Sequence, residues 1–169
     1  MIKNLIVRYA IILLLALFFP VFYMIFTPLT LYPVYLILSL FYSVIIEKTA
    51  LIVNGNSINL IDACIAGSAY FLLAILNLST PNVKKRILSL AFGLLSFLLL
   101  NILRIVVLSA LFLSNFSYFT ETHLISWYVL TAFFVLAIWI MTVKIFRIKE
   151  IPAYSDFISL KNISKKKKH

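Results

Sequence analysis

The sequence predicts an all-α integral membrane protein, built as a bundle of four transmembrane helices with five as the alternative. Of the 169 residues, 64% are hydrophobic and 12% are charged, and the mean hydropathy is +1.11. A soluble domain does not carry that composition, because charged residues make up about a quarter of an ordinary globular chain. The length suits one membrane domain, which we assign to residues 1–149, and a basic tail at 150–169.

Three spans follow from length alone. Residues 60–78, 87–113 and 123–146 are apolar runs long enough to cross a hydrocarbon core of roughly 30 Å as helices. The polar segments 79–82 and 114–122 separate them. We therefore expect three antiparallel helices in the second part of the chain.

The N-terminal region is apolar but interrupted by Pro20, Pro28 and Pro33. Residues 5–26 are predicted to form the first span. This run is longer than the roughly 7–15 residues of a signal-peptide core and lacks a small-residue cleavage site, so we expect a retained helix. Residues 31–46 are predicted to form either an extra span or a helix that lies in the outer membrane interface.

Basic residues predict the topology. The net charge of +10 does not indicate nucleic-acid binding, because its clusters, Lys84–Arg86 and the region 144–168, adjoin apolar spans. Both clusters should be cytoplasmic, which places the C-terminus inside and 47–59 outside. Lys3 and Arg8 favour an inside N-terminus, and one crossing before residue 47 satisfies this. We expect a multi-pass protein of the cell membrane with four spans; two crossings before residue 47 would give five.

A turn signal precedes the second span. Asn54-Gly55 lies between β-branched residues, and Asn-Gly is a strong signal for a two-residue hairpin. We expect a short hairpin or a plain loop before the helix that carries Cys64.

Arg104 is the clearest candidate for a functional residue. It lies nine residues before the end of the span 87–113, about 13 Å deep at 1.5 Å per residue. An arginine at such depth costs at least about 2.5–3.5 kcal/mol on insertion scales. The alternatives are snorkelling toward the outer interface or a structural ion pair. Asn101 precedes it by three residues and shares its helix face.

Two further candidates come from other helices. Cys64, the only cysteine, lies near the outer start of its span after Asp62, and a lone cysteine in an apolar helix is more often a packing residue. His123 opens the last span, two residues after Glu121. On the predicted topology Cys64, Arg104 and His123 all reach the outer leaflet, so a shallow pocket between helix ends would hold them together.

Such a trio suits acyl transfer. A thiolate is a nucleophile, a guanidinium stabilises a thiolate or an oxyanion, and an imidazole carries the proton. One cysteine excludes an intramolecular disulfide and a cysteine-based metal site. We expect no metal and no organic cofactor.

The residues resemble the signatures of a known family. Asp62-Ala63-Cys64-Ile65-Ala66-Gly67, then Asn101-Ile102-Leu103-Arg104, then His123 are similar to the Cys, Asn-x-x-Arg and His motifs of exosortases and archaeosortases. The resemblance covers roughly residues 18–146 and is closest to the compact archaeal branch called pacearchaeosortase. Gly67 follows the cysteine by three residues, whereas many members have Cys-Ser-Gly or Cys-Thr-Gly.

This resemblance implies a membrane cysteine transpeptidase with its active site facing the extracellular side. The implied nucleophile is Cys64, with Arg104 and His123 as the other catalytic residues. The resemblance also implies secreted protein substrates whose C-terminal sorting signal ends in a hydrophobic helix and a basic tail. The acyl group would pass to an amine, often lipid-linked. Asp62, Gly67, Asn101 and Glu121 are supporting candidates, and the residues do not indicate an oligomeric state.

The competing interpretation is a non-enzymatic membrane protein, such as a small transporter or an assembly subunit. Arg104 would then bind an anion or pair with a partner carboxylate, and Cys64 would be a packing residue. Transporters more often show paired charges at mid-membrane or internal repeats, and this sequence has no internal repeat.

Overall fold

The computed structural model describes residues 2–81, 83–158 and 161, and 72% of the structure is helical. The elements in order are α1 (Ile2–Leu17), α2 (Pro20–Ser39), β1 (Val44–Glu47), β2 (Ala50–Val53), β3 (Asn56–Asn59), α3 (Asp62–Ile65), α4 (Gly67–Ser79), α5 (Arg86–Leu113), α6 (Phe119–Ile125), the π-helical turn η1 (Ser126–Leu130) and α7 (Thr131–Ile145).

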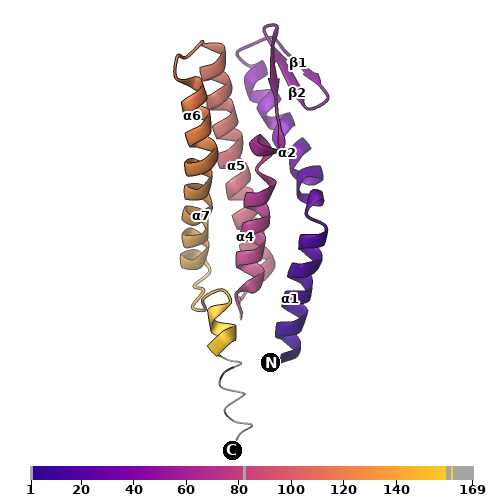
Figure 1. The fold of residues 1–169 in the computed structure, drawn as a ribbon, viewed down its shortest axis with the longest axis vertical. Coiled ribbons are helices and arrows are strands. Elements are labelled where there is room, and N and C mark those ends of the chain that lie inside the picture. Colours follow the sequence, from indigo (N-terminus) through magenta and orange to yellow (C-terminus); the bar gives the residue numbers. More distant parts are fainter. Residues whose placement is uncertain (1, 82, 159–160, 162–169) are drawn as a thin grey trace, which may run out of the picture.

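The helices form one elongated bundle (Figure 1). The two termini lie at one end of it, here called the terminal end, and the three strands lie at the other, the sheet end. The chain rises through α1 and α2, descends through α4, rises through α5 and descends through α6 and α7. The helix α5 packs against α2, α4 and α7, so it is central to the bundle.

Four helical segments are long and apolar enough to cross a membrane: Pro20–Ser39, Asp62–Ser79, Arg86–Leu113 and Phe119–Ile145. The apolar part of α1, Leu5–Leu17, is shorter. The expected helical bundle with four spans is confirmed at this level, and the arrangement is compatible with a multi-pass membrane protein. The last span begins at Phe119, four residues before the predicted start.

The division of the N-terminal region was predicted wrongly. No single helix covers 5–26, because the chain turns at Phe18 and Phe19 and a new helix starts at Pro20. Proline has no N–H to donate to the preceding turn, but at the first position of a helix that donor is not needed. Since α1 and α2 follow one another along the bundle, together they make one passage from the terminal end to the sheet end (Figure 1).

There is also no separate helix over 31–46. Residues 31–39 complete α2, which continues through Pro28 and Pro33, and 44–47 form β1. Proline inside an apolar helix is tolerated where neighbouring helices or side chains satisfy the freed backbone groups. Within the described residues, the segment 31–46 therefore forms neither a separate interfacial helix nor a fifth span.

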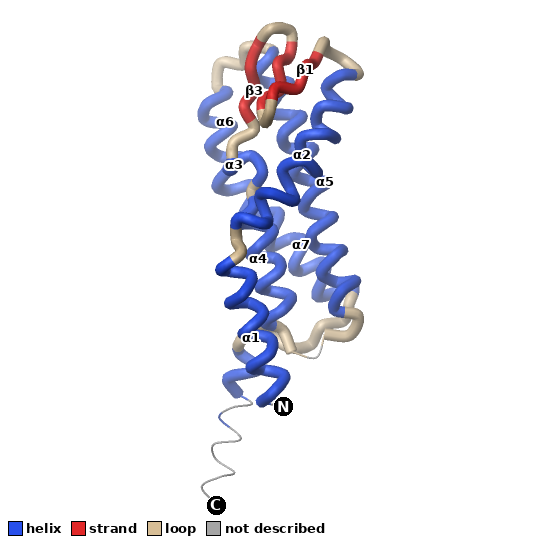
Figure 2. Tube along the Cα trace, turned by 90° about the vertical axis from the view of Figure 1, so that its right-hand side faces the viewer, coloured by secondary structure: helices blue, strands red, loops and turns tan. Residues whose placement is uncertain are grey.

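The hairpin before the Cys64 helix is confirmed, and it belongs to a sheet of three antiparallel strands in the order β1-β2-β3 (Figure 2). Asn54 and Gly55 both have positive φ, as a two-residue hairpin turn requires. Leu51 and Val53 of β2 are fully buried. The predicted all-α fold is therefore corrected, because the structure contains this sheet. The alternating buried side chains of β2 lie on the face of the sheet that packs on the bundle.

Aromatic rings fill the bundle beneath the sheet. Phe26 of α2 stacks on Tyr70 of α4, with ring centroids 3.6 Å apart, and Phe97 of α5 meets Tyr70 edge-on at 4.8 Å. All three are buried. This core joins α2, α4 and α5.

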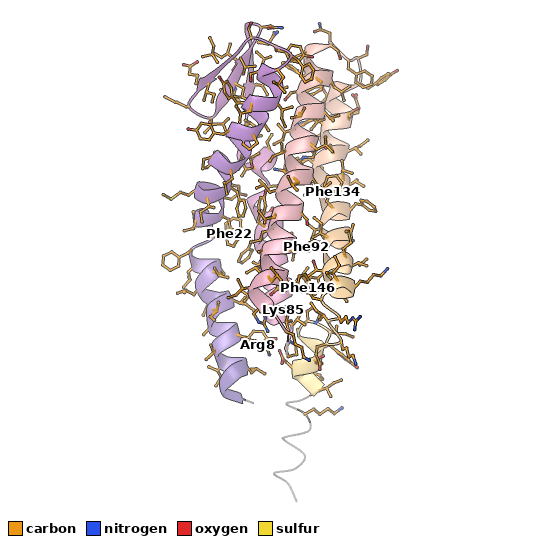
Figure 3. All side chains as sticks on the ribbon, turned by 180° about the vertical axis from the view of Figure 1, so that it is seen from behind. Arg8, Phe22, Lys85, Phe92, Phe134 and Phe146 are labelled. Carbon is orange, nitrogen blue, oxygen red and sulfur yellow. The ribbon has the colours of Figure 1, made fainter. Side chains whose placement is uncertain are left out.

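Basic residues gather toward the terminal end, where Arg8 and Lys85 both lie (Figure 3). Arg8 Nη2 donates to both carboxylate oxygens of Asp156 in an ion pair, so the chain after α7 is tied to α1. The start of the predicted basic tail therefore packs on the bundle. The lysine run 165–168 lies outside the described residues.

Candidate functional site

The helix that carries Cys64 is broken, which corrects the continuous helix predicted over 60–78. Asp62–Ile65 forms a single turn, and Ala66 then adopts the left-handed conformation with φ 58° and ψ 42°. A left-handed alanine costs roughly 1–2 kcal/mol. The Ala66 N–H still donates to the Asp62 carbonyl, but the carbonyls of the last turn of α3 lose their usual helical partners.

Two side chains of α5 replace those partners. The Asn101 amide donates to the carbonyls of Cys64 at 3.0 Å and Ile65 at 3.3 Å. Arg104 Nη2 donates to the Cys64 carbonyl at 3.1 Å and the Ala63 carbonyl at 3.4 Å. The polar notch predicted on α5 therefore caps a broken helix, and a cation at a helix C-terminus also suits the helix dipole.

Arg104 makes a third contact, with the last span. Its Nη1 donates to Thr131 Oγ1 at 2.5 Å, and the Thr131 hydroxyl donates to the Ser126 carbonyl at 3.2 Å. That carbonyl belongs to the π-helical turn η1, and such turns often occur at functional sites. Arg104, only 7% exposed, thus joins α3, α5 and α7. Among the described residues its Nε has no hydrogen-bond partner.

The three predicted catalytic side chains line one cavity of about 210 Å³ near the sheet end. Cys64 lines it from α3, Arg104 from α5 and His123 from α6. The segment Ser57–Ile61 forms another wall, and most of the remaining lining is apolar. The structure therefore brings together residues from three separate helical segments, as the sequence predicted.

Within the cavity the three functional groups are not hydrogen-bonded to one another in the described part of the chain. The His123 ring is partly buried and stacks on Phe119, with centroids 5.8 Å apart and an interplanar angle of 11°. Cys64 is partly buried and its thiol is free. The cavity of about 210 Å³ that the three residues line has room for a small bound group.

The supporting candidates separate into two groups. Asp62 and Glu121 are exposed and do not line the cavity. Asn101 is buried and acts through the backbone of Cys64, as described above. Gly67 is also buried, and a Cβ there would lie 2.7 Å from Tyr23 Cζ, so this glycine permits close approach of α2 to α4. It contributes packing beside the break rather than a group in the cavity.

Sequence reasoning missed Thr131 and the wall formed by Ser57, Ile58 and Asn59. A hydroxyl within the last apolar span is the signal that would have singled out Thr131. The wall carries no such signal, because only the folded sheet brings it over Cys64.

The fold and the site define a class: a helical bundle whose spans are apolar enough for a membrane, with a largely apolar cavity beneath a small sheet that Cys64, Arg104 and His123 line. No family model, curated protein or solved structure matches this chain. In the described ranges no three His, Cys, Asp or Glu side chains gather closely enough to hold a metal ion.

Proposed function

We propose that this chain is a membrane-embedded cysteine transpeptidase whose sheet end faces the outside of the cell. The observation that carries the proposal is the common cavity of Cys64, Arg104 and His123. A nucleophile, a proton carrier and a fixed positive charge around one small space are the groups that acyl transfer requires.

The proposed reaction has two halves. His123 accepts the Cys64 proton, and the sulfur attacks the carbonyl carbon of the scissile peptide bond. The carbon–nitrogen bond breaks, His123 returns the proton to the departing amine, and a thioester remains. An acceptor amine then attacks the thioester carbonyl, the carbon–sulfur bond breaks, and His123 moves the amine proton to the Cys64 sulfur.

Arg104 has two roles in this proposal. Its Nη2 holds the backbone of α3 and its Nη1 holds Thr131, so Arg104 positions the turn that carries Cys64 at the cavity. Arg104 also lines the cavity, so its positive charge would stabilise the developing oxyanion. A buried guanidinium contributes this charge without needing to reorganise during the reaction.

We propose secreted proteins with a C-terminal hydrophobic sorting signal as substrates and an amine, often lipid-linked, as acceptor. A hydrophobic helix would approach such a bundle from within the membrane, beside the exposed apolar faces of its spans. Its preceding segment would then reach the depth of Cys64.

The test is co-expression with a secreted protein that carries such a signal. Cys64→Ala should abolish release of the signal while the variant still inserts and accumulates. Glu121→Gln is the matched control, because Glu121 lies near His123 in α6 but is exposed and outside the cavity. Wild-type processing by Cys64→Ala would contradict the proposal.

A second candidate is a non-enzymatic membrane protein in which Arg104 is structural. The capping of α3 by Arg104 and Asn101 favours it, since these bonds stabilise the bundle whether or not Cys64 reacts. In that case Cys64→Ala would leave every property of the protein in place, whereas Arg104 substitutions would destabilise the bundle.

A further inference from the structure

The cavity lies along the free edge of β3. Five consecutive residues, Ser57 to Ile61, line it. Neighbouring side chains of a strand point to opposite faces of the sheet, so a space on one face would touch alternate residues only. Since β2 occupies the other edge of β3, the space that contacts all three of Ser57, Ile58 and Asn59 lies along the unpaired edge.

The strand register identifies the backbone groups at this edge. The Leu60 N–H donates to the Thr49 carbonyl at 3.1 Å. Hydrogen-bonded pairs alternate along an antiparallel ladder, so Ile58 and Asn56 also bond to β2, opposite Leu51 and Val53. The N–H and C=O groups of Ser57 and Asn59 therefore point away from β2, toward the free edge.

Most of these outward groups lack a partner in the described backbone. The Asn59 carbonyl accepts the Ile61 N–H at 3.1 Å, which leaves the Ser57 N–H, the Ser57 carbonyl and the Asn59 N–H. Five residues after Asn59 the chain reaches Cys64. These free backbone donors and acceptors therefore belong to the segment that lines the cavity together with Cys64.

We propose that the free edge of β3 binds an extended peptide segment as a fourth strand and presents its main chain to Cys64. This rests on the proposed function and adds the mode of substrate recognition: backbone hydrogen bonds to Ser57 and Asn59. An unpaired edge selects an extended peptide, because only a peptide main chain repeats amide donors and acceptors at the strand spacing. A lipid acyl chain has no such groups.

The polarity and the length of the β3 edge also fit a short peptide. Ser57 and Asn59 are polar and exposed, whereas the edge of a dimer interface is usually long and apolar. With β3 only four residues long, the edge accommodates a segment of a few residues. A second copy of this chain is the alternative occupant that the experiment excludes or reveals.

The experiment measures alkylation of Cys64 in purified full-length protein in nanodiscs. The peptide probe is acetyl-tetra-alanine chloromethyl ketone, and the small probe is chloroacetamide. In each case the thiolate sulfur displaces chloride, and the thiol proton goes to buffer. We divide the rate with the peptide probe by the rate with the small probe. This ratio cancels differences in thiol reactivity between variants, so it reports binding of the peptide near Cys64.

Ser57→Pro removes the outward N–H and keeps the bonds between β2 and β3, since proline is tolerated at an edge strand whose N–H faces outward. Its matched control, Ser57→Ala, removes only the hydroxyl. We expect Ser57→Pro to lower the rate ratio roughly tenfold, the effect of losing one hydrogen bond, and Ser57→Ala to leave it unchanged.

A probe with N-methylated amides tests the same edge on wild-type protein, so a misfolded variant does not decide the result. It should react with the same roughly tenfold loss. Equal ratios for the plain and N-methylated probes, or for Ser57→Pro and Ser57→Ala, would overturn edge binding. A ratio that changes with protein concentration, together with a dimer in solution, would overturn it in favour of a second copy.

These outcomes are separate from those of the proposed function. If Cys64→Ala still processes substrates, the transpeptidase proposal fails whatever the alkylation ratio. If Cys64→Ala is inactive while the ratio is insensitive to Ser57→Pro and to N-methylation, edge binding alone fails.

Discussion

Arg104 donates a hydrogen bond to the backbone carbonyl of Cys64 across 3.1 Å, which joins the buried arginine of α5 to the only cysteine of the chain. The contact is made to the main chain and not to the thiol. It exists because Ala66 interrupts the helix directly after Cys64 and leaves carbonyls without helical donors. Cys64 lines the cavity directly before this interruption, and Arg104 supplies a donor that the broken helix lacks.

Arg104→Lys tests whether the several N–H donors of the guanidinium stabilise the protein more than its positive charge alone. One ammonium does not span Thr131 and the Cys64 carbonyl as a guanidinium does. We expect the free energy of unfolding to fall by about 2 kcal/mol, measured by tryptophan fluorescence during denaturation in mixed micelles. Arg147→Lys, at an exposed position, is the control and should change it by less than about 0.5 kcal/mol. Equal stability of the two variants would contradict the capping role.

His123→Ala tests proton transfer. The imidazole lines the cavity, and loss of a general acid–base typically lowers a rate by about 10²–10⁴-fold. We expect signal release in the co-expression assay to fall within that range, while alkylation of Cys64 by chloroacetamide still proceeds. Full processing by His123→Ala would show that another group carries the proton.

Asn101→Leu tests the second cap. Leucine removes the donor to the Cys64 and Ile65 carbonyls, and buried groups left unpaired cost about 1–3 kcal/mol. We expect α3 to loosen, so Cys64 should be alkylated by chloroacetamide at least about fivefold faster. Leu103→Ala, on the exposed face of the same helix, should alter that rate by less than about twofold. An unchanged rate in Asn101→Leu would mean that Arg104 alone holds the turn.

Gly67→Ala tests the close approach of α2 to α4. The added Cβ would meet the Tyr23 ring at 2.7 Å, and overpacking of this kind costs about 1–3 kcal/mol. Tyr23→Ala in the same chain should recover at least about 1 kcal/mol in a double-mutant cycle. Gly93→Ala is the matched control, because its Cβ would meet only Thr142 Oγ1 at 4.0 Å and should stabilise the helix slightly. Additive effects of Gly67→Ala and Tyr23→Ala would rule out the clash.

Sidedness is tested by a thiol reagent that does not cross membranes. Cys64 lies toward the sheet end, so we expect labelling in intact cells. Lys84→Cys, introduced into Cys64→Ala, lies in the loop between α4 and α5 at the terminal end and should be labelled only in inverted vesicles. The opposite pattern would invert the topology and place the cavity in the cytoplasm.

The sequence alone determined those helices whose ends are set by neighbouring residues. The span 87–113 matches α5 to within one residue, because polar segments flank a continuous apolar run. The turn at Asn54-Gly55 was equally predictable, since positive φ at both central positions suits these residues. Cys64, Arg104 and His123 lie on three successive spans, and the topology predicted that all three reach the same membrane face. The structure brings them to one cavity.

Only the tertiary structure decided where the helices break. Pro20 begins a helix while Pro28 and Pro33 lie within one, and the difference depends on what satisfies the freed backbone groups. Ala66 carries no turn signal at all. Its break is stabilised by Asn101 and Arg104, which follow Cys64 by 37 and 40 residues. Local sequence patterns do not report donors that arrive from so far along the chain, so the shape of the site emerged only when α5 packed against α3.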